Sequence, residues 1–176
     1  MNRKLRIVFI PLFISIIFLV TACQPKEKET LNEDVTTLNG RITSTQTIFS
    51  QAELTVVNVW SPSCADCKQE LTISGDLNQE YAGMGVQVIG LIKDVDTENE
   101  SSSLKMIEDT GANYTHILDS DNVTYKVPTT LYIDQNGKLL GTSQKPHADI
   151  SQWRDEIESY HQKVCTGDHP AECAVG

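Results

Sequence analysis

Short apolar runs alternate with amphipathic segments over most of the chain. The runs at 54–60 and 86–92 are mostly apolar and rich in Val and Ile, which is typical of strands buried on both faces of a sheet. A third run, at 115–118, predicts a short strand. Two more strands, at 129–133 and 138–142, are predicted because the Asn-Gly sequence between them favours a hairpin turn.

The segments between and after these strands carry helical patterns. We predict helices at 67–81, 98–109 and 149–162. In the last of these, Ile150, Trp153, Ile157 and Tyr160 fall on one stripe. The order β-α-β-α-β-β-α predicts an α/β fold, in which a central mixed β-sheet is flanked by helices on both faces.

Length and charge narrow the class of protein. The chain has 176 residues, which suits a single domain with one buried core. It carries 24 acidic and 14 basic residues, for a formal net charge of −10. Because phosphate binding needs a basic face, we expect no nucleic-acid partner.

The first 22 residues have the pattern of a targeting segment. Arg3, Lys4 and Arg6 precede an apolar stretch at 7–20. This stretch is shorter than the ~20 residues that a membrane span needs, and it fits the apolar region of a signal peptide. We predict a cleaved signal peptide at 1–22, with an uncleaved membrane anchor as the alternative.

The sequence Val-Thr-Ala-Cys at 20–23 resembles a bacterial lipobox. This resemblance implies that Cys23 becomes a lipidated N-terminus, which would hold the protein at the extracytoplasmic face of the cell membrane. The polar composition that follows predicts a flexible tether at 23–39. We place the folded domain at 40–162 and a C-terminal tail at 163–176.

Cys64 and Cys67 carry the strongest chemical signal in the sequence. The strand at 54–60 leads through a short loop to both cysteines, which open the next helix. A helix N-terminus lowers the pKa of a thiol, and the thiolate is the species that attacks disulfides. The second sulfur can then release the mixed disulfide that the first one forms. We therefore predict a redox-active disulfide, with an exposed Cys64 as nucleophile and an inward-facing Cys67 as resolving thiol.

Two other interpretations of this pair stay open. An inert structural disulfide would close a very small loop and would therefore stabilise the fold little. Half of a zinc site would need two more ligands of similar spacing. The candidates, about a hundred residues away, are His161, Cys165, His169 and Cys173. We expect no metal site.

The sequence VVNVWSPSCADCKQE at 56–70, followed later by Val-Pro-Thr-Thr at 127–130, resembles the thioredoxin superfamily. The similarity is greatest to the membrane-tethered TlpA/ResA-like branch, and it covers 40–162. It implies a thioredoxin-like fold and thiol-disulfide oxidoreductase activity without a cofactor.

The resemblance also implies a substrate site. In the family, the proline that matches Pro128 is cis, lies beside the active-site disulfide and helps bind extended substrate backbone. An ordinary trans proline at the start of a strand is the alternative. By the same resemblance, we expect Trp60, Val127 and Thr129 to bind substrate.

The motif departs from that of cytosolic thioredoxins. Ser63 stands where they have Trp, Ala65 and Asp66 replace Gly and Pro, and Asn58 replaces a buried Asp. Glu70 matches a Glu found near the active site in the ResA-like branch, so we expect it to handle the proton of the resolving thiol. The alternative is a solvated carboxylate in the first turn of the helix, which the helix dipole stabilises.

Asp66 predicts the direction of electron flow. A negative charge within one turn of both sulfurs disfavours the thiolate, and a less stable reduced form makes the couple more reducing. We therefore expect a reductase, with a disulfide-forming oxidase as the alternative. The family resemblance implies a CcdA/DsbD-type membrane electron donor. It also implies envelope protein disulfides as substrates, for example those of apocytochrome c or methionine sulfoxide reductase.

The C-terminal Cys165 and Cys173 flank a segment with Gly and Pro. Outside the cytosol such a pair predicts a structural disulfide, and a second redox pair is the alternative.

A non-catalytic, metal-binding lipoprotein of the same fold is a different class of function. Copper carriers of this fold have a longer cysteine spacing and a further His ligand, whose place neither His116 nor His147 matches. A peroxiredoxin would need a Thr-x-x-Cys context, which is missing here.

Overall fold

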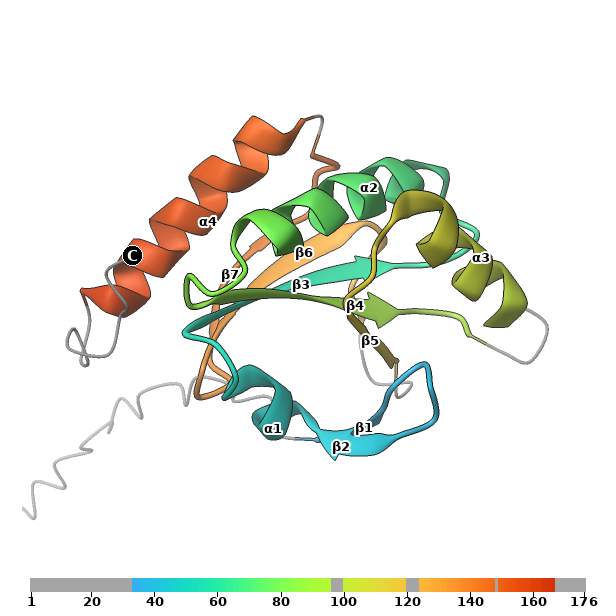
Figure 1. Ribbon diagram of the computed structural model, residues 1–176, viewed down its shortest axis with the longest axis horizontal. Coiled ribbons are helices and arrows are strands. Elements are labelled where there is room, and N and C mark those ends of the chain that lie inside the picture. Colours follow the sequence, from blue (N-terminus) through green and yellow to red (C-terminus); the bar gives the residue numbers. More distant parts are fainter. Residues whose placement is uncertain (1–32, 96–99, 120–123, 148, 167–176) are drawn as a thin grey trace, which may run out of the picture.

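The structure, a computed structural model, describes residues 33–95, 100–119, 124–147 and 149–166. Its elements are β1 (Asp34–Thr36), β2 (Ile42–Ser44), α1 (Thr45–Phe49), β3 (Leu54–Trp60), α2 (Ala65–Glu80), β4 (Val86–Ile92), α3 (Glu100–Thr110), β5 (Thr115–Leu118), β6 (Thr129–Asp134), β7 (Leu139–Ser143) and α4 (Ile150–Cys165). Five strands form one sheet in the order β5-β4-β3-β6-β7 (Figure 1). β3, β4 and β5 are parallel, whereas β6 and β7 are antiparallel to their neighbours. The predicted α/β fold with a central mixed sheet is confirmed.

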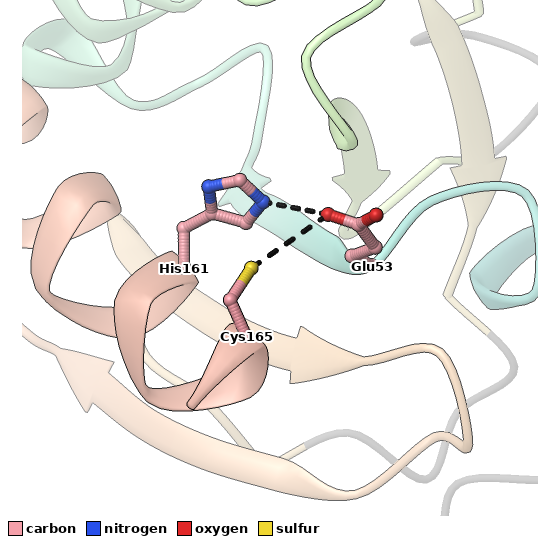
Figure 2. A group of neighbouring side chains, drawn as sticks. All are labelled: Glu53, His161 and Cys165. Carbon is pink, nitrogen blue, oxygen red and sulfur yellow. Dashed lines mark hydrogen bonds and ion pairs between the residues drawn. The ribbon is translucent and has the colours of Figure 1, made fainter. Parts of the chain in front are cut away.

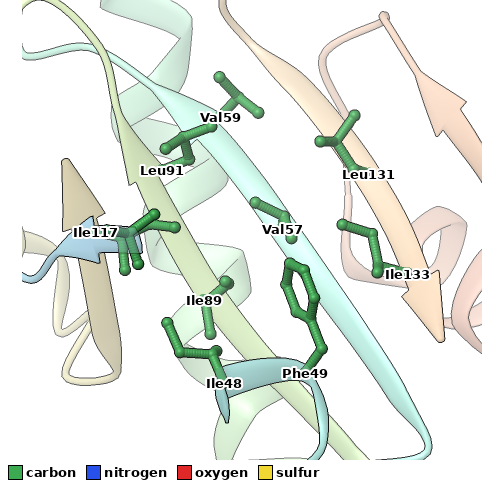
Figure 3. Packing of buried hydrophobic residues seen from close by; sticks show 10 residues of the cluster. Ile48, Phe49, Val57, Val59, Ile89, Leu91, Ile117, Leu131 and Ile133 are labelled. Atoms are coloured by element: carbon green, nitrogen blue, oxygen red, sulfur yellow. The ribbon is translucent and has the colours of Figure 1, made fainter. Parts of the chain in front are cut away.

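Different elements pack on the two faces of the sheet. α2, α3 and α4 lie over one face, and α1 with the β1–β2 hairpin lies over the other (Figure 1). Successive side chains of a strand point to opposite faces, so each buried strand supplies two cores. Val57 and Val59 of β3 pack with Phe49 of α1 (Figure 3). Leu54 and Val56 belong to the second cluster, beneath α2 and α4.

The folded body begins before residue 40, which is the boundary that the sequence predicts. β1 lies within the predicted tether at 23–39 and pairs antiparallel with β2. The backbone N–H of Thr37 donates to the carbonyl of Arg41, and Thr37 also forms a bridge with Ile117 of β5. Val35, only 6% exposed, packs into the core beside α1. These contacts tie the segment to the sheet in spite of its polar composition, which corrects the tether boundary.

α4 extends beyond the predicted helix at 149–162. Asp149 caps its N-terminus, because the Asp149 carboxylate accepts hydrogen bonds from the backbone N–H groups of Ser151 and Gln152. The helix continues to Cys165, so this cysteine belongs to α4 and not to a tail that starts at 163.

The described residues include no helix that is both long enough and apolar enough to cross a membrane. The predicted signal peptide at 1–22, the predicted lipidation site Cys23 and the cysteine Cys173 lie outside the described residues.

Candidate active site at the head of α2

The loop between β3 and α2 carries the two central cysteines. Cys64 is the N-cap residue of α2, Cys67 lies in the first turn, and the two form a disulfide with their Cα atoms 5.3 Å apart. The backbone N–H of Cys64 donates to the carbonyl of Ser61, whose hydroxyl lies 2.9 Å from that of Ser63. The loop therefore holds the disulfide at the positive end of the helix dipole.

The two cysteines differ in exposure, as the sequence predicts. Cys64 is half-buried, whereas Cys67 is 0% exposed. Cys67 packs in a cluster with Trp60, Leu71 and Ile92. A disulfide on another protein can therefore reach only the sulfur of Cys64.

The segment before β6 lies beside this loop. Val59 of β3 pairs with Thr129 of β6, so the antiparallel register places Pro128 at the end of β3 that leads to Cys64. The Val127–Pro128 peptide bond is cis. Val127 and Cys64 are both partly buried and pack against the same cluster. The Thr129 side chain is 1% exposed, and its hydroxyl donates to a backbone carbonyl, so it has no surface for substrate contact.

Trp60 lies beneath the site and not on its surface. It is 0% exposed, and its indole N–H donates to Nδ1 of His116 at 3.3 Å. A side chain without exposed surface cannot touch a substrate, which corrects the expectation that the Trp60 side chain binds one. Burial lowers the pKa of His116 to about 4, so the ring is neutral and can accept this hydrogen bond.

Glu70 is a buried carboxyl group one turn after Cys67 on α2. It is 1% exposed, so the alternative of a solvated Glu70 is wrong. Its Oε1 accepts a hydrogen bond from the backbone N–H of His147 at 2.8 Å and lies 3.1 Å from Nδ1 of that residue. Its Oε2 is buried and has no hydrogen-bond partner within the described part of the chain. Asn58 of β3 stands where cytosolic thioredoxins have a buried Asp, and its amide cannot take up a proton as a carboxylate does. The buried carboxyl group of this site is therefore that of Glu70, on α2.

His147 connects Glu70 to α4. Its Nε2 lies 3.2 Å from Oε2 of Glu156, and the hydroxyl of Tyr132 donates to the same oxygen at 2.6 Å. The His147 ring lies against Trp153, with ring centroids 4.6 Å apart. Burial and the bond to Glu156 hold the pKa of Tyr132 above its usual range. Sequence reasoning missed His147 and Glu156 as site residues, because no local motif marks them.

A second cluster of polar side chains lies at the far end of α4. Nε2 of His161 and Sγ of Cys165 lie 2.8 Å and 3.9 Å from Oε2 of Glu53, at the start of β3 (Figure 2). This is the one metal-ligand-like group found among the described residues, and it does not include the cysteine pair of α2. Cys165 is disulfide-bonded, so its sulfur offers no thiolate to a metal ion. The predicted pairing with Cys173 stays a prediction, since Cys173 lies outside the described residues.

Known proteins share this architecture. A sequence model of the AhpC/TSA family matches residues 28–142. The thiol-disulfide oxidoreductase ResA of Bacillus cereus is 26% identical over 143 residues, which cover 78% of this chain and 77% of ResA. A secreted disulfide oxidoreductase of Mycobacterium tuberculosis, homologous to E. coli DsbE, matches with a TM-score of 0.58 at 20% identity, over 75% of this chain and 96% of that protein. A thiol:disulfide interchange protein of the thioredoxin family from Chlorobium tepidum has a TM-score of 0.64 at 14% identity, over 78% of this chain and 99% of the other.

These similarities agree with the geometry of the site. The solved structures establish the thioredoxin-like fold. The family match spans most of the chain and includes the cysteine pair at the head of α2. This chain therefore belongs to the AhpC/TSA family, and it is a thiol-disulfide oxidoreductase with a thioredoxin-like fold.

Proposed function

We propose that the protein is an extracytoplasmic reductase of protein disulfides. The observation that carries the proposal is the difference between a half-buried Cys64 at the head of α2 and a fully buried Cys67 behind it. The Cys64 thiolate attacks one sulfur of a substrate disulfide and displaces the other sulfur as a thiolate. Cys67 then attacks Cys64, releases the second substrate sulfur and closes the Cys64–Cys67 disulfide. Two electrons pass from the cysteine pair to the substrate.

Other residues of the site assist this exchange. Glu70 takes the proton that Cys67 must lose before it attacks, since it is a buried carboxyl group on the same helix. Val127, together with the backbone at the buried Pro128 and at Thr129, binds an extended stretch of substrate beside Cys64. The register of β3 with β6 and the partly exposed position of Val127 support this placement.

The negative charge of Asp66 supports electron flow from the cysteine pair to the substrate. Asp66 is exposed in the first turn of α2, between the two cysteines, where a carboxylate disfavours a thiolate. The reduced form is therefore a ready electron donor. A membrane protein of the CcdA/DsbD type would return it to the reduced state.

The proposed location rests on the N-terminal sequence. A signal peptide at 1–22 and a lipid on Cys23 would hold the domain at the outer face of the cell membrane. One similar protein of known structure is secreted, which supports a site outside the cytosol. Suitable substrates in that compartment are the disulfides of apocytochrome c and of methionine sulfoxide reductase.

Insulin reduction tests the proposed function. The chain without residues 1–22 should accelerate precipitation of insulin by dithiothreitol, and Cys64→Ser should remove the acceleration. Cys165→Ser serves as the matched control, because the sulfur it removes lies at the far end of α4. Equal acceleration by Cys64→Ser and the wild-type protein would overturn the assignment.

A further inference from the structure

We propose that His147 and Glu156 form a proton relay that connects buried Glu70 to solvent. This inference rests on the proposed function, in which Glu70 takes the proton of Cys67. A carboxyl group that is 1% exposed cannot exchange protons with water directly at every turnover. Among the described residues, the hydrogen bonds of Glu70 lead outward through the imidazole of His147, which is 0% exposed. The imidazole in turn contacts the Glu156 side chain, which is 30% exposed.

The contacts between Glu70, His147 and Glu156 allow a proton to pass from one group to the next. Oε1 of Glu70 lies 3.1 Å from Nδ1 of His147, and Oε2 of Glu156 lies 3.2 Å from Nε2. Each contact needs one proton between its two heavy atoms. Two carboxylates require a doubly protonated ring, whereas a neutral ring requires that one carboxyl group be protonated. The relay carries the same total charge in all three arrangements, so its charge changes only when Glu70 takes up a proton or Glu156 releases one.

The surrounding groups hold the relay in place. The backbone N–H of His147 donates to Glu70, and the hydroxyl of Tyr132 on β6 donates to Glu156 on α4. Tyr114, which precedes β5, keeps its proton because burial raises its pKa, and the charge of Glu70 raises it further. No Lys or Arg forms an ion pair with Glu70 or Glu156 among the described residues.

The relay acts in the second half of the exchange. The Cys67 thiol gives its proton to Glu70 as its sulfur attacks Cys64, and the bond from Cys64 to the substrate sulfur breaks. Glu70 then passes a proton to Nδ1 of His147 while Nε2 releases one to Glu156, which gives it to water. The electrons move only between sulfur atoms, and the relay moves only the proton.

Stopped-flow reaction of the reduced protein with Ellman's reagent separates the two halves of the thiol-disulfide exchange, which are the attack by Cys64 and the attack by Cys67. Attack by Cys64 releases the first thionitrobenzoate at a rate that depends on reagent concentration, and attack by Cys67 releases the second at a rate that does not. We expect His147→Gln and Glu156→Gln to slow the second phase about tenfold or more, because a positioned general base typically contributes 10²–10⁴-fold. The first phase should be unchanged, which excludes general loss of structure. Glu158→Gln removes the same charge from the exposed side of α4 and should alter neither phase.

A proton inventory distinguishes a relay from a structural role. In mixtures of light and heavy water, the second-phase rate of the wild-type protein should curve with deuterium fraction, because several protons move together. Glu156→Gln, in which the amide cannot pass on a proton as a carboxyl group does, should make the dependence linear. If Glu70→Gln slows the second phase while His147→Gln and Glu156→Gln match Glu158→Gln, the relay is overturned and the proposed function stands. Failure of the insulin assay would instead overturn the proposed function.

Discussion

The indole N–H of Trp60 donates to Nδ1 of His116, and this bond joins the end of β3 to β5 across the intervening strand β4. The other ring nitrogen of His116 lies 2.9 Å from the carbonyl oxygen of Ala112. A neutral ring satisfies both contacts, with Nε2 as donor and Nδ1 as acceptor. Because the loop to Cys64 starts immediately after Trp60, this buried pair fixes the base of the active site.

The buried state of His116 should make stability depend on pH. Its pKa is about 4 in the folded protein against 6.5 for an unperturbed His, so the unfolded chain binds the proton first as the pH falls. The stabilisation is complete above 6.5 and is lost progressively down to about 4. We expect the free energy of unfolding to fall by about 3 kcal/mol over this window through this group alone.

Urea titrations of the wild-type protein and of His116→Gln measure this contribution. Other titrating groups are common to both proteins, so the difference between their pH profiles isolates His116. Parallel profiles would show that His116 has the same pKa in the folded and the unfolded protein, which would contradict its burial as a neutral ring.

Because Gly90 of β4 has no side chain, Trp60 and His116 can occupy the space beside it. A Cβ atom at Gly90 would collide with Nδ1 of His116 and lie 2.9 Å from Nε1 of Trp60. We expect Gly90→Ala to lower the free energy of unfolding by about 1–3 kcal/mol, the usual cost of overpacking. In a double-mutant cycle with His116→Ala, the two effects should be far from additive, because the smaller side chain removes the collision. Additive effects would show that the loss of stability in Gly90→Ala does not come from a collision with His116.

Much of the fold could be predicted because hydrophobic pattern and burial coincide. The strands at 54–60 and 86–92 have the predicted bounds, since each is a mostly apolar run in the interior of the sheet, and the short edge strand at 115–118 also has its predicted bounds. β1, β2 and α1 were missed because they have three, three and five residues and few apolar side chains. Their stability comes from distant contacts, such as the bridge between Thr37 and Ile117, which no local pattern records.

The exposure difference between the cysteines should govern their reactivity. In the reduced protein we expect iodoacetamide to modify Cys64 at least about tenfold faster than Cys67, because access and thiolate character both favour Cys64. Peptide mass spectrometry after timed quenching measures the two rates. Denatured protein is the control, and there the rates should become similar. Faster modification of Cys67 in the folded protein would reverse the assigned roles.

Asp66 should tune the reduction potential of the pair. Asp66→Asn removes a negative charge between the two sulfurs, stabilises the thiolate and should raise the potential by on the order of 10 mV, as expected of an exposed charge. Asp76→Asn is the matched control, since Asp76 is exposed on the same helix but distant from the disulfide. The shift should shrink at high salt. An equal shift in both variants would assign the effect to net charge.

The sequence could identify the cysteine pair but not the network behind it. Cys64 and Cys67 are adjacent in sequence and form a recognisable motif, and Glu70 is part of the same segment. His147 lies 77 residues from Glu70 and 9 from Glu156, so only the packing of α4 beside α2 brings the three together. Burial also cannot be derived from residue type: the family resemblance implies that Trp60 binds substrate, but the side chain lies beneath the site.

The reduction potential of the Cys64–Cys67 couple tests the central claim most directly. Equilibration of the wild-type domain in dithiothreitol buffers, followed by acid quenching and thiol alkylation, gives the fraction that is reduced at each potential. A disulfide reductase should have a potential nearer to the ~−270 mV of thioredoxin than to the ~−120 mV of DsbA. A value near that of DsbA would identify an oxidase and contradict the proposed direction of electron flow.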